Sequence, residues 1–472
     1  MDLEKQKRNQ IVRVVLTEIL MVLAIIPIVI FLTLMAMGYR LGEDLSLEQS
    51  GLVQVNSLPN GATVKIDGEN KFRTDASRML AGGEHTLEIS KDGFDSWSKK
   101  IEVTPGFLLR VRYPRLFRLE RKAESVLELG SLRFFSAAPS RTRLLYQAED
   151  ITKLQLVNIR NDDIKINTID LSGVLPLSET GEPLGTIGKI KWSWNSDAAL
   201  MELNYADGAD WLLVDMRENV PSRNLSRDFG LAITDVQSAG DSIERLYVLE
   251  NGNLREVNLN NNGITKVLLA NVEEFNAEQT VVGYIGKTAE KRTVGVYHNG
   301  ADDGITIAEL EPGLEAHVVT SEYYGEKYLS YTVGSKLMIY EGESFPADDS
   351  EVKRMRLVIS ADLEADLNGQ IIVSRTGEVI LTRNDSSVVA VDLETNKYSE
   401  YDASAAIRFI DDYLLYGVTD GELLVWDFDG LNKRSLARGV ADFGAVIAAN
   451  NKWLYYVTNV DERVVLVREQ IN

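Results

Sequence analysis

The chain has 472 residues, roughly three times a typical domain of ~150 residues, so two or more domains are expected. Apolar residues make up 44% and charged residues 26%, which excludes a disordered or fibrous chain. Cysteine is absent, so disulfides, thiolate metal sites and cysteine nucleophiles are excluded. The net charge of −21 arises in residues 121–472, which hold 34 Lys and Arg against 56 Asp and Glu, and this acidity argues against a nucleic-acid partner.

An uncharged apolar segment, residues 19–39, lies near the N-terminus. As a helix it is about 31 Å long, enough to cross a hydrocarbon core of about 30 Å. Basic residues precede it, namely Lys5, Lys7, Arg8 and Arg13. The positive-inside rule therefore predicts a cytoplasmic stub at residues 1–18, a single transmembrane helix at 19–39 and extracytoplasmic domains after it. Residues 40–50 are predicted to be a polar linker.

A cleavable signal peptide is the alternative for this segment. Ala36-Met37-Gly38 supplies a small-x-small pattern, although the apolar region exceeds the about 7–15 residues usual in signal peptides. Glu18, at the cytoplasmic edge, is expected to reach the membrane interface. We interpret the segment as an anchor and leave cleavage open.

Residues 51–120 contain short runs in which apolar and polar residues alternate, a pattern typical of half-buried strands. Five strands are predicted, at Leu52–Val55, Ala62–Asp67, His85–Ser90, Lys99–Val103 and Phe107–Tyr113. Turn-forming residues separate them, first at Pro59-Asn60-Gly61 and then at Asp67-Gly68. Such regular turns within about 70 residues indicate a small β-sandwich.

The residues at these turns resemble a known family. The matching segments are Pro59-Asn60-Gly61-Ala62, Val64-x-Ile66-Asp67-Gly68, Gly83-x-His85 and Gly93-Phe94-x-x-Trp97, and together they resemble a PEGA domain, with Asn60 where Glu is usual. The resemblance implies an extracytoplasmic β-sandwich of prokaryotic envelope proteins, often suspected of surface-layer or carbohydrate association. From its residue type alone, Trp97 is expected in the core, and His85 is expected to be structural.

A run of basic residues ends this domain: Arg110, Arg112, Arg115, Arg118, Arg121 and Lys122. Charges on a solvated strand edge, which discourage edge-to-edge pairing, are the favoured interpretation. A positive stripe near anionic lipid headgroups is the alternative.

Residues 121–472 show a degenerate repeat of an apolar strand, a polar turn and a second apolar strand. The repeats begin at Leu144, Leu200, Leu246, Val281, Leu329, Ile371, Leu414 and Leu454. Their spacing of about 44 residues predicts a β-propeller of four-stranded units, with eight blades, or seven as the alternative, and with almost no helix. Trp194-Asn195-Ser196-Asp197 and residues 391–396 resemble blades of WD40-like and quinoprotein-like propellers.

The last predicted strand, residues 464–470, leaves its blade one strand short. Either residues 116–119 or residues 125–129 are expected to supply the missing outer strand, which would close the ring and remove open sheet edges.

Motifs that carry chemistry are scarce. Residues 281–288 nearly match a phosphate-binding loop, but Val281 replaces its first glycine and a hairpin is predicted there. Only His298 and His317 could serve a Ser–His–Asp triad in the propeller. The aspartate pairs, such as Asp162-Asp163, lack the spacing of a calcium loop. No catalytic, cofactor-binding or metal-binding residue is therefore predicted, and no cofactor.

The sequence thus predicts a mainly β protein with a transmembrane helix, a PEGA-like sandwich at 51–120 and a propeller at 121–472. The leading hypothesis is a non-catalytic, membrane-anchored envelope protein whose propeller binds an envelope protein or a cell-wall or surface-layer glycan. The alternative is a surface glycan hydrolase or lyase that uses carboxylates about 5–10 Å apart in the propeller channel, one with a raised pKa. A third hypothesis makes the propeller a scaffold for another membrane protein.

Overall fold

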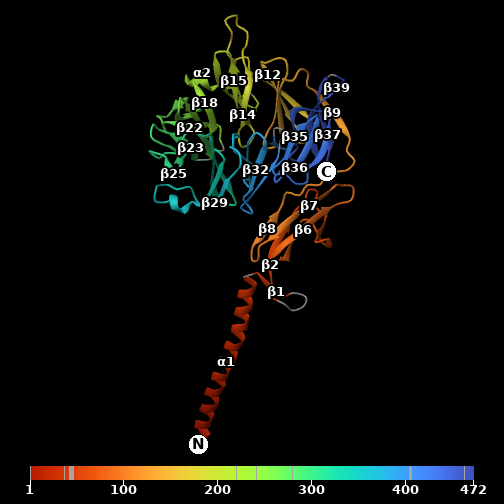
Figure 1. Cartoon of the computed structure of the whole chain (residues 1–472), viewed down its shortest axis with the longest axis vertical. Coiled ribbons are helices and arrows are strands. Elements are labelled where there is room, and N and C mark those ends of the chain that lie inside the picture. Colours follow the sequence, from red (N-terminus) through yellow and green to blue (C-terminus); the bar gives the residue numbers. More distant parts are fainter. Residues whose placement is uncertain are drawn as a thin grey trace. The chain divides into compact units, whose positions relative to one another are not determined.

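The structure is a computed structural model of the chain. It describes residues 2–36, 38–41, 47–218, 220–240, 242–278, 280–402, 407–461 and 463–472. Most of these residues form strands, and the chain divides into two compact units, Met1–Leu119 and Glu120–Asn472 (Figure 1). Of the predicted linker, residues 42–46 lie outside the described residues.

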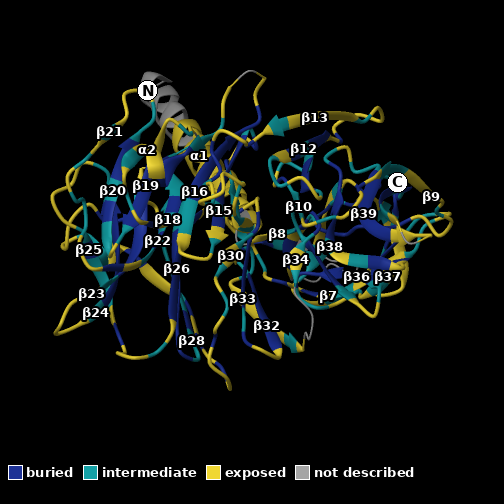
Figure 2. Ribbon diagram, turned by 90° about the horizontal axis from the view of Figure 1, so that it is seen from above, coloured by how far each residue is buried: buried dark blue, intermediate teal, exposed yellow. Residues whose placement is uncertain are grey.

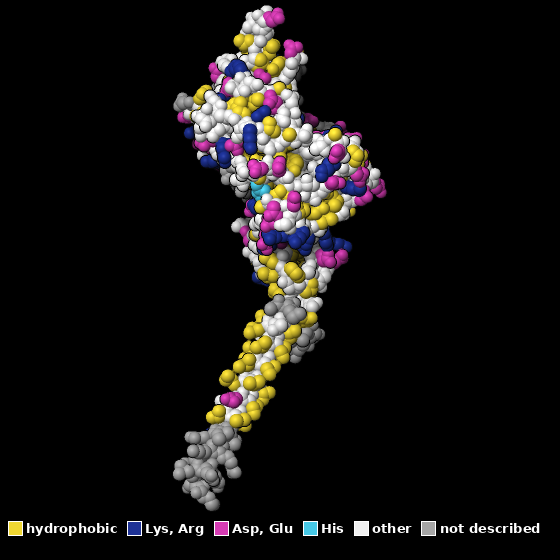
Figure 3. All heavy atoms as spheres, turned by 90° about the vertical axis from the view of Figure 1, so that its left-hand side faces the viewer, with side chains coloured by type: hydrophobic (Ala, Val, Ile, Leu, Met, Phe, Trp, Pro, Cys, Tyr) yellow, Lys and Arg dark blue, Asp and Glu magenta, His cyan; other side chains and the backbone are white. Residues whose placement is uncertain are grey.

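Helix α1 (Asp2–Ala36) opens the first unit. Its apolar part, Arg13–Met35, has a mean hydropathy of 2.9 and is long enough to cross a membrane, as a span or within a signal peptide. The side chains of this part are exposed and largely hydrophobic (Figure 3). The helix ends three residues before the predicted boundary at Tyr39, because Gly38 adopts a left-handed φ of 80° and its N–H donates to Met35 O.

The described residues of the first unit then form the strands β1 (Tyr39–Leu41), β2 (Leu47–Val55), β3 (Thr63–Ile66), β4 (Glu69–Arg73), β5 (Ala76–Ala81), β6 (Gly83–Ser90), β7 (Ser96–Val103) and β8 (Leu108–Val111). They form two sheets, one with the order β1-β2-β5 and β8 paired to β2, the other with the order β4-β3-β6-β7. The five predicted strands are present, but β1, β4 and β5 were not predicted. Strands β4 and β5 are mostly exposed, so they lack the apolar alternation that marks a half-buried strand.

The inward side chains of the first unit form its core. Val53, Val64 and Leu87 are fully buried, and Trp97 is 1% exposed, which confirms its predicted place in the core. His85 has the predicted structural role, because its Nδ1 lies 2.7 Å from Asp67 Oδ2 in the β3–β4 turn.

The basic run does not form one surface. Arg115 is buried, so it belongs neither to a solvated strand edge nor to a lipid-facing stripe, and both interpretations are wrong at this position. Arg110 and Arg112 are partly buried, and Arg121 lies in the second unit.

The second unit consists of four-stranded antiparallel sheets. The first four are β10 (Phe134–Ala137), β11 (Arg143–Gln147), β12 (Lys153–Asn158), β13 (Lys165–Asp170); β14 (Thr186–Trp192), β15 (Ala198–Tyr205), β16 (Gly208–Asp215), β17 (Arg223–Asn224); β18 (Ile233–Ser238), β19 (Arg245–Glu250), β20 (Asn253–Asn258), β21 (Gly263–Ile264); and β22 (Val272–Glu278), β23 (Val281–Lys287), β24 (Arg292–His298), β25 (Ile305–Leu310).

The remaining sheets are β26 (Ala316–Tyr323), β27 (Glu326–Val333), β28 (Lys336–Gly342), β29 (Arg356–Asp362); β30 (Ile372–Val373), β31 (Val379–Arg383), β32 (Ser387–Asp392), β33 (Lys397–Asp402); β34 (Arg408–Phe409), β35 (Leu414–Thr419), β36 (Glu422–Asp427), β37 (Arg434–Arg438); and β38 (Val440–Ile447), β39 (Trp453–Val460), β40 (Arg463–Gln470), β9 (Ala123–Glu128). Repeated four-stranded sheets confirm the predicted propeller. The described residues form eight such sheets, and since this count covers only those residues, the blade number stays a prediction.

Apolar clusters fill the spaces between neighbouring sheets, and Figure 2 shows buried strands with exposed connecting loops. The last sheet takes its fourth strand from the start of the unit, since β9 pairs antiparallel with β40. Of the two closing segments predicted, residues 125–129 are therefore the correct one. Seven of the eight predicted repeat starts lie in the second strand of a sheet. The exception is Ile371, which directly precedes β30, the short first strand of its sheet.

Among its described residues, the second unit has two short helical segments where almost no helix was expected: α2 (Leu225–Phe229) and a single 3₁₀ turn, η1 (Val352–Arg354). The side chain of Asn224 caps α2 by accepting a hydrogen bond from Arg227 N, and Gly230 ends it in the left-handed conformation. A helix of five residues is too short to show a 3.6-residue pattern in the sequence.

Candidate functional site

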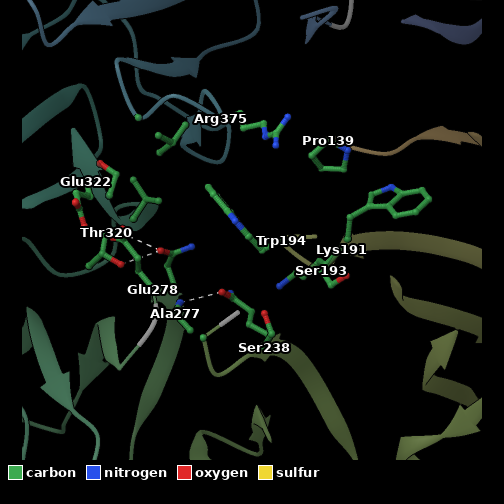
Figure 4. A pocket seen from close by; sticks show the side chains of 18 of the residues that line it. Pro139, Lys191, Ser193, Trp194, Ser238, Ala277, Glu278, Thr320, Glu322 and Arg375 are labelled. Carbon is green, nitrogen blue, oxygen red and sulfur yellow. Dashed lines mark hydrogen bonds between the residues drawn. The ribbon is translucent and has the colours of Figure 1, made fainter. Parts of the chain in front are cut away.

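A cavity of about 970 Å³ lies among the first strands of consecutive sheets in the propeller. Most of its lining comes from five of these strands or the residues that follow them, on β14, β18, β22, β26 and β30, and Pro139 and residues of β15 and β16 complete it. The first strands of propeller sheets surround the central channel, so the cavity belongs to that channel. Figure 4 shows Ala277, Glu278, Thr320 and Glu322 on one side and Lys191 and Ser193 on the other.

Amide side chains on the first strands join three consecutive sheets, those that begin with β18, β22 and β26. Gln237 Nε2 donates to Phe275 O at 2.8 Å, and its Oε1 accepts from Ala277 N at 2.9 Å. One sheet further, Asn276 Oδ1 accepts from both N and Oγ1 of Thr320, at 3.0 and 3.1 Å. These amides satisfy backbone groups that face the channel and fix the positions of the strands around it.

Two charged groups at the cavity are paired. Lys191 bonds to Asp235 on β18, the first strand of the next sheet, and Glu322 bonds to Lys327. Glu278 differs, because within the described residues its buried Oε2 has no hydrogen-bond partner. Burial raises the pKa of Glu278 above its ordinary value; nearby Lys327 opposes this shift, and Glu322 adds to it.

Two aromatic side chains at the cavity are largely exposed. Trp194 is 62% exposed and Tyr324 is 60% exposed, although both line the cavity. Trp194 lies two residues after the end of β14, and Tyr324 directly follows β26. Exposed aromatic rings beside a cavity offer flat apolar surfaces to a ligand, whereas a propeller core would bury them.

The segments with chemical motifs lie elsewhere. Residues 281–287 form strand β23, which pairs with β24 in a hairpin as predicted. His317 Nδ1 donates to Glu274 Oε2 at 2.8 Å, and His298 Nε2 lies 2.8 Å from Pro346 O. In the part of the chain that the structure describes, no cluster of three or more His, Asp or Glu side chains is placed to hold a metal ion.

The enzyme hypothesis required carboxylates in the propeller channel, but the sequence did not indicate which residues these would be. The polar residues of the cavity come mainly from separate first strands more than 30 residues apart in the sequence, and apolar side chains form much of the remaining lining. A sequence signal did exist: each first strand precedes a recognised apolar strand, so polar residues just before those strands were candidates for the channel.

A family model for the PEGA domain matches residues 50–114. The curated proteins contain no match to this chain. The chain therefore combines a PEGA domain with a β-propeller and an N-terminal apolar helix.

Several solved propellers are similar to this chain. The C-terminal WD40 domain of Sif2 is 11% identical, with a TM-score of 0.47, over 73% of this chain and 97% of that one. Sqt1 from Chaetomium thermophilum is 13% identical, with a TM-score of 0.43, over 74% and 99%. An oligogalacturonate lyase in complex with manganese is 12% identical, with a TM-score of 0.41, over 73% and 99%. At these values the likeness says nothing about what this chain binds.

Proposed function

We propose that this chain is a membrane-anchored, non-catalytic binding protein of the cell envelope, with its N-terminus in the cytoplasm and both β units outside. Helix α1 is the anchor, and its orientation rests on the basic residues before the span and the acidic ones after it. The propeller cavity is the binding site, and a segment of envelope glycan is its ligand.

The observation that carries the proposal is the pairing of exposed aromatic rings with neutral polar groups at one cavity. A sugar ring has hydroxyl groups that need hydrogen-bond partners and an apolar face that packs on an aromatic ring. Trp194 and Tyr324 supply such rings, and Ser238 supplies a hydroxyl group. A volume of about 970 Å³ is enough for several sugar units.

The binding test is co-sedimentation of the full chain, held in detergent micelles, with isolated cell wall stripped of protein. We expect Trp194→Ala to lower the affinity about tenfold or more, because loss of a stacking ring costs on the order of 1.4 kcal/mol. The matched control is Tyr398→Ala, since Tyr398 is also exposed but lies on β33, outside the cavity lining.

Sedimentation that Trp194→Ala leaves unchanged would refute the cavity as the glycan site. If the wild-type chain does not sediment with stripped wall but does with untreated wall, the partner is an envelope protein, and the scaffold hypothesis takes precedence.

Topology is tested with single cysteines, since the chain has none of its own. A cysteine at position 398 should react with a membrane-impermeant maleimide in intact cells, because we place the propeller outside. Reaction only after lysis would refute this orientation. The mass of the purified chain separates an anchor from a signal peptide, because cleavage after residues 36–38 would remove α1.

Glu278 supports a second candidate, a glycan hydrolase or lyase. Its raised pKa is what a general acid requires, and Glu322, a second carboxyl group, lies on the neighbouring strand β26. An enzyme would release new reducing ends or unsaturated products from the wall, and Glu278→Gln would abolish that release. No release by the wild-type chain would leave binding as the function.

A further inference from the structure

The outer face of one sheet of the first unit carries an apolar row. Val53 points into the core, so its neighbour Leu52 points outward on β2. Met79 on β5 and Leu108 on β8 are the register partners of Leu52, on either side of it. The three side chains are exposed and adjacent, and together they are called the apolar row.

The other outer face of the same sandwich is polar. At its centre, Lys65 on β3 is paired with Glu88 on β6, and Glu88 is paired with Ser98 on β7. The outer faces of the two sheets therefore differ, because one exposes apolar side chains and the other exposes polar ones. The outer face of a sheet in contact with water normally exposes polar side chains.

The apolar row lies close to the end of the apolar helix. Gly38 N donates to Met35 O at 3.0 Å, and Gly38 O accepts from both N and Oγ of Ser50, at 2.7 and 2.9 Å. Leu52 lies two residues further along β2, which is about 7 Å. A headgroup layer is about 5–7 Å thick on each side of the hydrocarbon core. The row therefore lies at the depth of the headgroups or their outer boundary.

Phe107 extends this surface. It is 70% exposed, and its carbonyl oxygen accepts from Leu52 N at 2.9 Å. The preceding residue, Gly106, donates its N–H to Ser50 O at 2.9 Å, which fixes the β7–β8 turn beside the end of the helix. An exposed phenylalanine at headgroup depth is typical of a residue that enters the interface.

We propose that Phe107 and the apolar row dock on the lipid bilayer that α1 spans, so that the PEGA domain lies on the membrane surface. This inference rests on the proposed anchor. The occupant is lipid rather than a second copy or another protein, because hydrogen bonds hold the surface next to the last residues of the span. Docking would fix the base of the protein and limit the reach of the chain beyond it.

The test uses single-cysteine variants of the full chain, Phe107→Cys, Glu88→Cys and Leu23→Cys, each labelled with the environment-sensitive dye NBD. Each is reconstituted into phosphatidylcholine–phosphatidylglycerol vesicles that contain lipids with brominated acyl chains. Position 23 lies inside the span and reports on the anchor, and position 88 lies on the polar face. We expect quenching at 107 to be at least about twofold stronger than at 88, with position 23 strongly quenched.

Quenching at 23 with equal, weak quenching at 107 and 88 would overturn the docking and leave the anchor standing. Absence of quenching at 23 would overturn both proposals. The double variant Leu52→Gln, Met79→Gln should bring quenching at 107 down to the value at 88, and unchanged quenching there would show that the apolar row does not hold the surface. A signal at 107 that depends on the protein-to-lipid ratio would assign the surface to a second copy.

Discussion

Arg121 and Glu469 form an ion pair where the first strand of the propeller meets the last, and replacing Arg121 by methionine measures what this contact contributes. Arg121 Nε lies 3.2 Å from Glu469 Oε2, and the side chains are only 18% and 10% exposed. Arg121 also donates to Leu436 O at 2.9 Å, and Glu469 accepts a second bond from Tyr456 OH at 2.7 Å. These bonds thus join the segment just before β9 to the middle of β37 and the end of β40.

The expected cost follows from burial. Removing one partner of a buried pair costs about 3–5 kcal/mol when the other charge loses its partner. Here Tyr456 still donates to Glu469, and some solvent reaches both side chains, so Arg121→Met should lower the free energy of unfolding by about 2–3 kcal/mol. Glu469→Gln should cost less, about 1–2 kcal/mol, because the amide can still accept from Tyr456.

The assay is urea unfolding of the full chain in detergent, followed by tryptophan fluorescence, with the free energy taken from the midpoint and slope. The same strand pair offers a matched control, Arg463 with Glu128, at 3.4 Å and with side chains 68% and 56% exposed. Arg463→Met should cost less than about 0.5 kcal/mol. If Arg121→Met lowers the free energy of unfolding no more than Arg463→Met does, burial does not make the Arg121–Glu469 pair more stabilising than an exposed pair.

Three further predictions concern other parts of the molecule. Trp97→Ala should destabilise the PEGA domain by about 3–5 kcal/mol, seen as faster proteolysis within residues 47–118, because a fully buried indole is lost. The hydrogen bond to Glu274 raises the pKa of His317, so the protonated imidazole stabilises the folded state fully below about pH 6.5. This stabilisation is lost as the pH rises through the folded-state pKa of His317. The melting temperature should therefore fall over that pH range, and it should fall less in His317→Gln. Gly377→Ala should cost at least about 2 kcal/mol in urea unfolding, because the new Cβ would lie 1.9 Å from Glu322 O at a φ of 77°, whereas Gly300→Ala, also at positive φ but in open space, should cost less.

Local sequence patterns determined most of the strands. Alternation with period two marked strands such as Ala62–Asp67 and His85–Ser90, and the residue type of Trp97 was enough to place it correctly in the core. The turn at Asp67-Gly68 was equally clear, since both residues adopt the positive φ angles, 53° and 84°, that such a dipeptide favours. The repeat spacing then required a propeller, because each four-stranded unit needs neighbours to cover its two apolar faces.

Some features depend on tertiary contacts and could not be predicted from local sequence patterns. Strands β4 and β5 are held by pairing to their neighbours rather than by burial, so their own residues give little sign of them. The end of α1 depends on Gly38, whose left-handed conformation is fixed by contacts with Ser50 and Gly106 further along the chain.

The sequence by itself determined the class of each segment: an apolar helix, a PEGA-like sandwich and an acidic propeller without cysteine chemistry. The tertiary structure alone assembled the cavity and placed Glu278, Trp194 and Tyr324 around it. The physical reason is that a strand pattern records contacts within one sheet, whereas the channel is made by first strands from separate sheets. Their polar residues meet only after the ring has formed, and no local periodicity records that meeting.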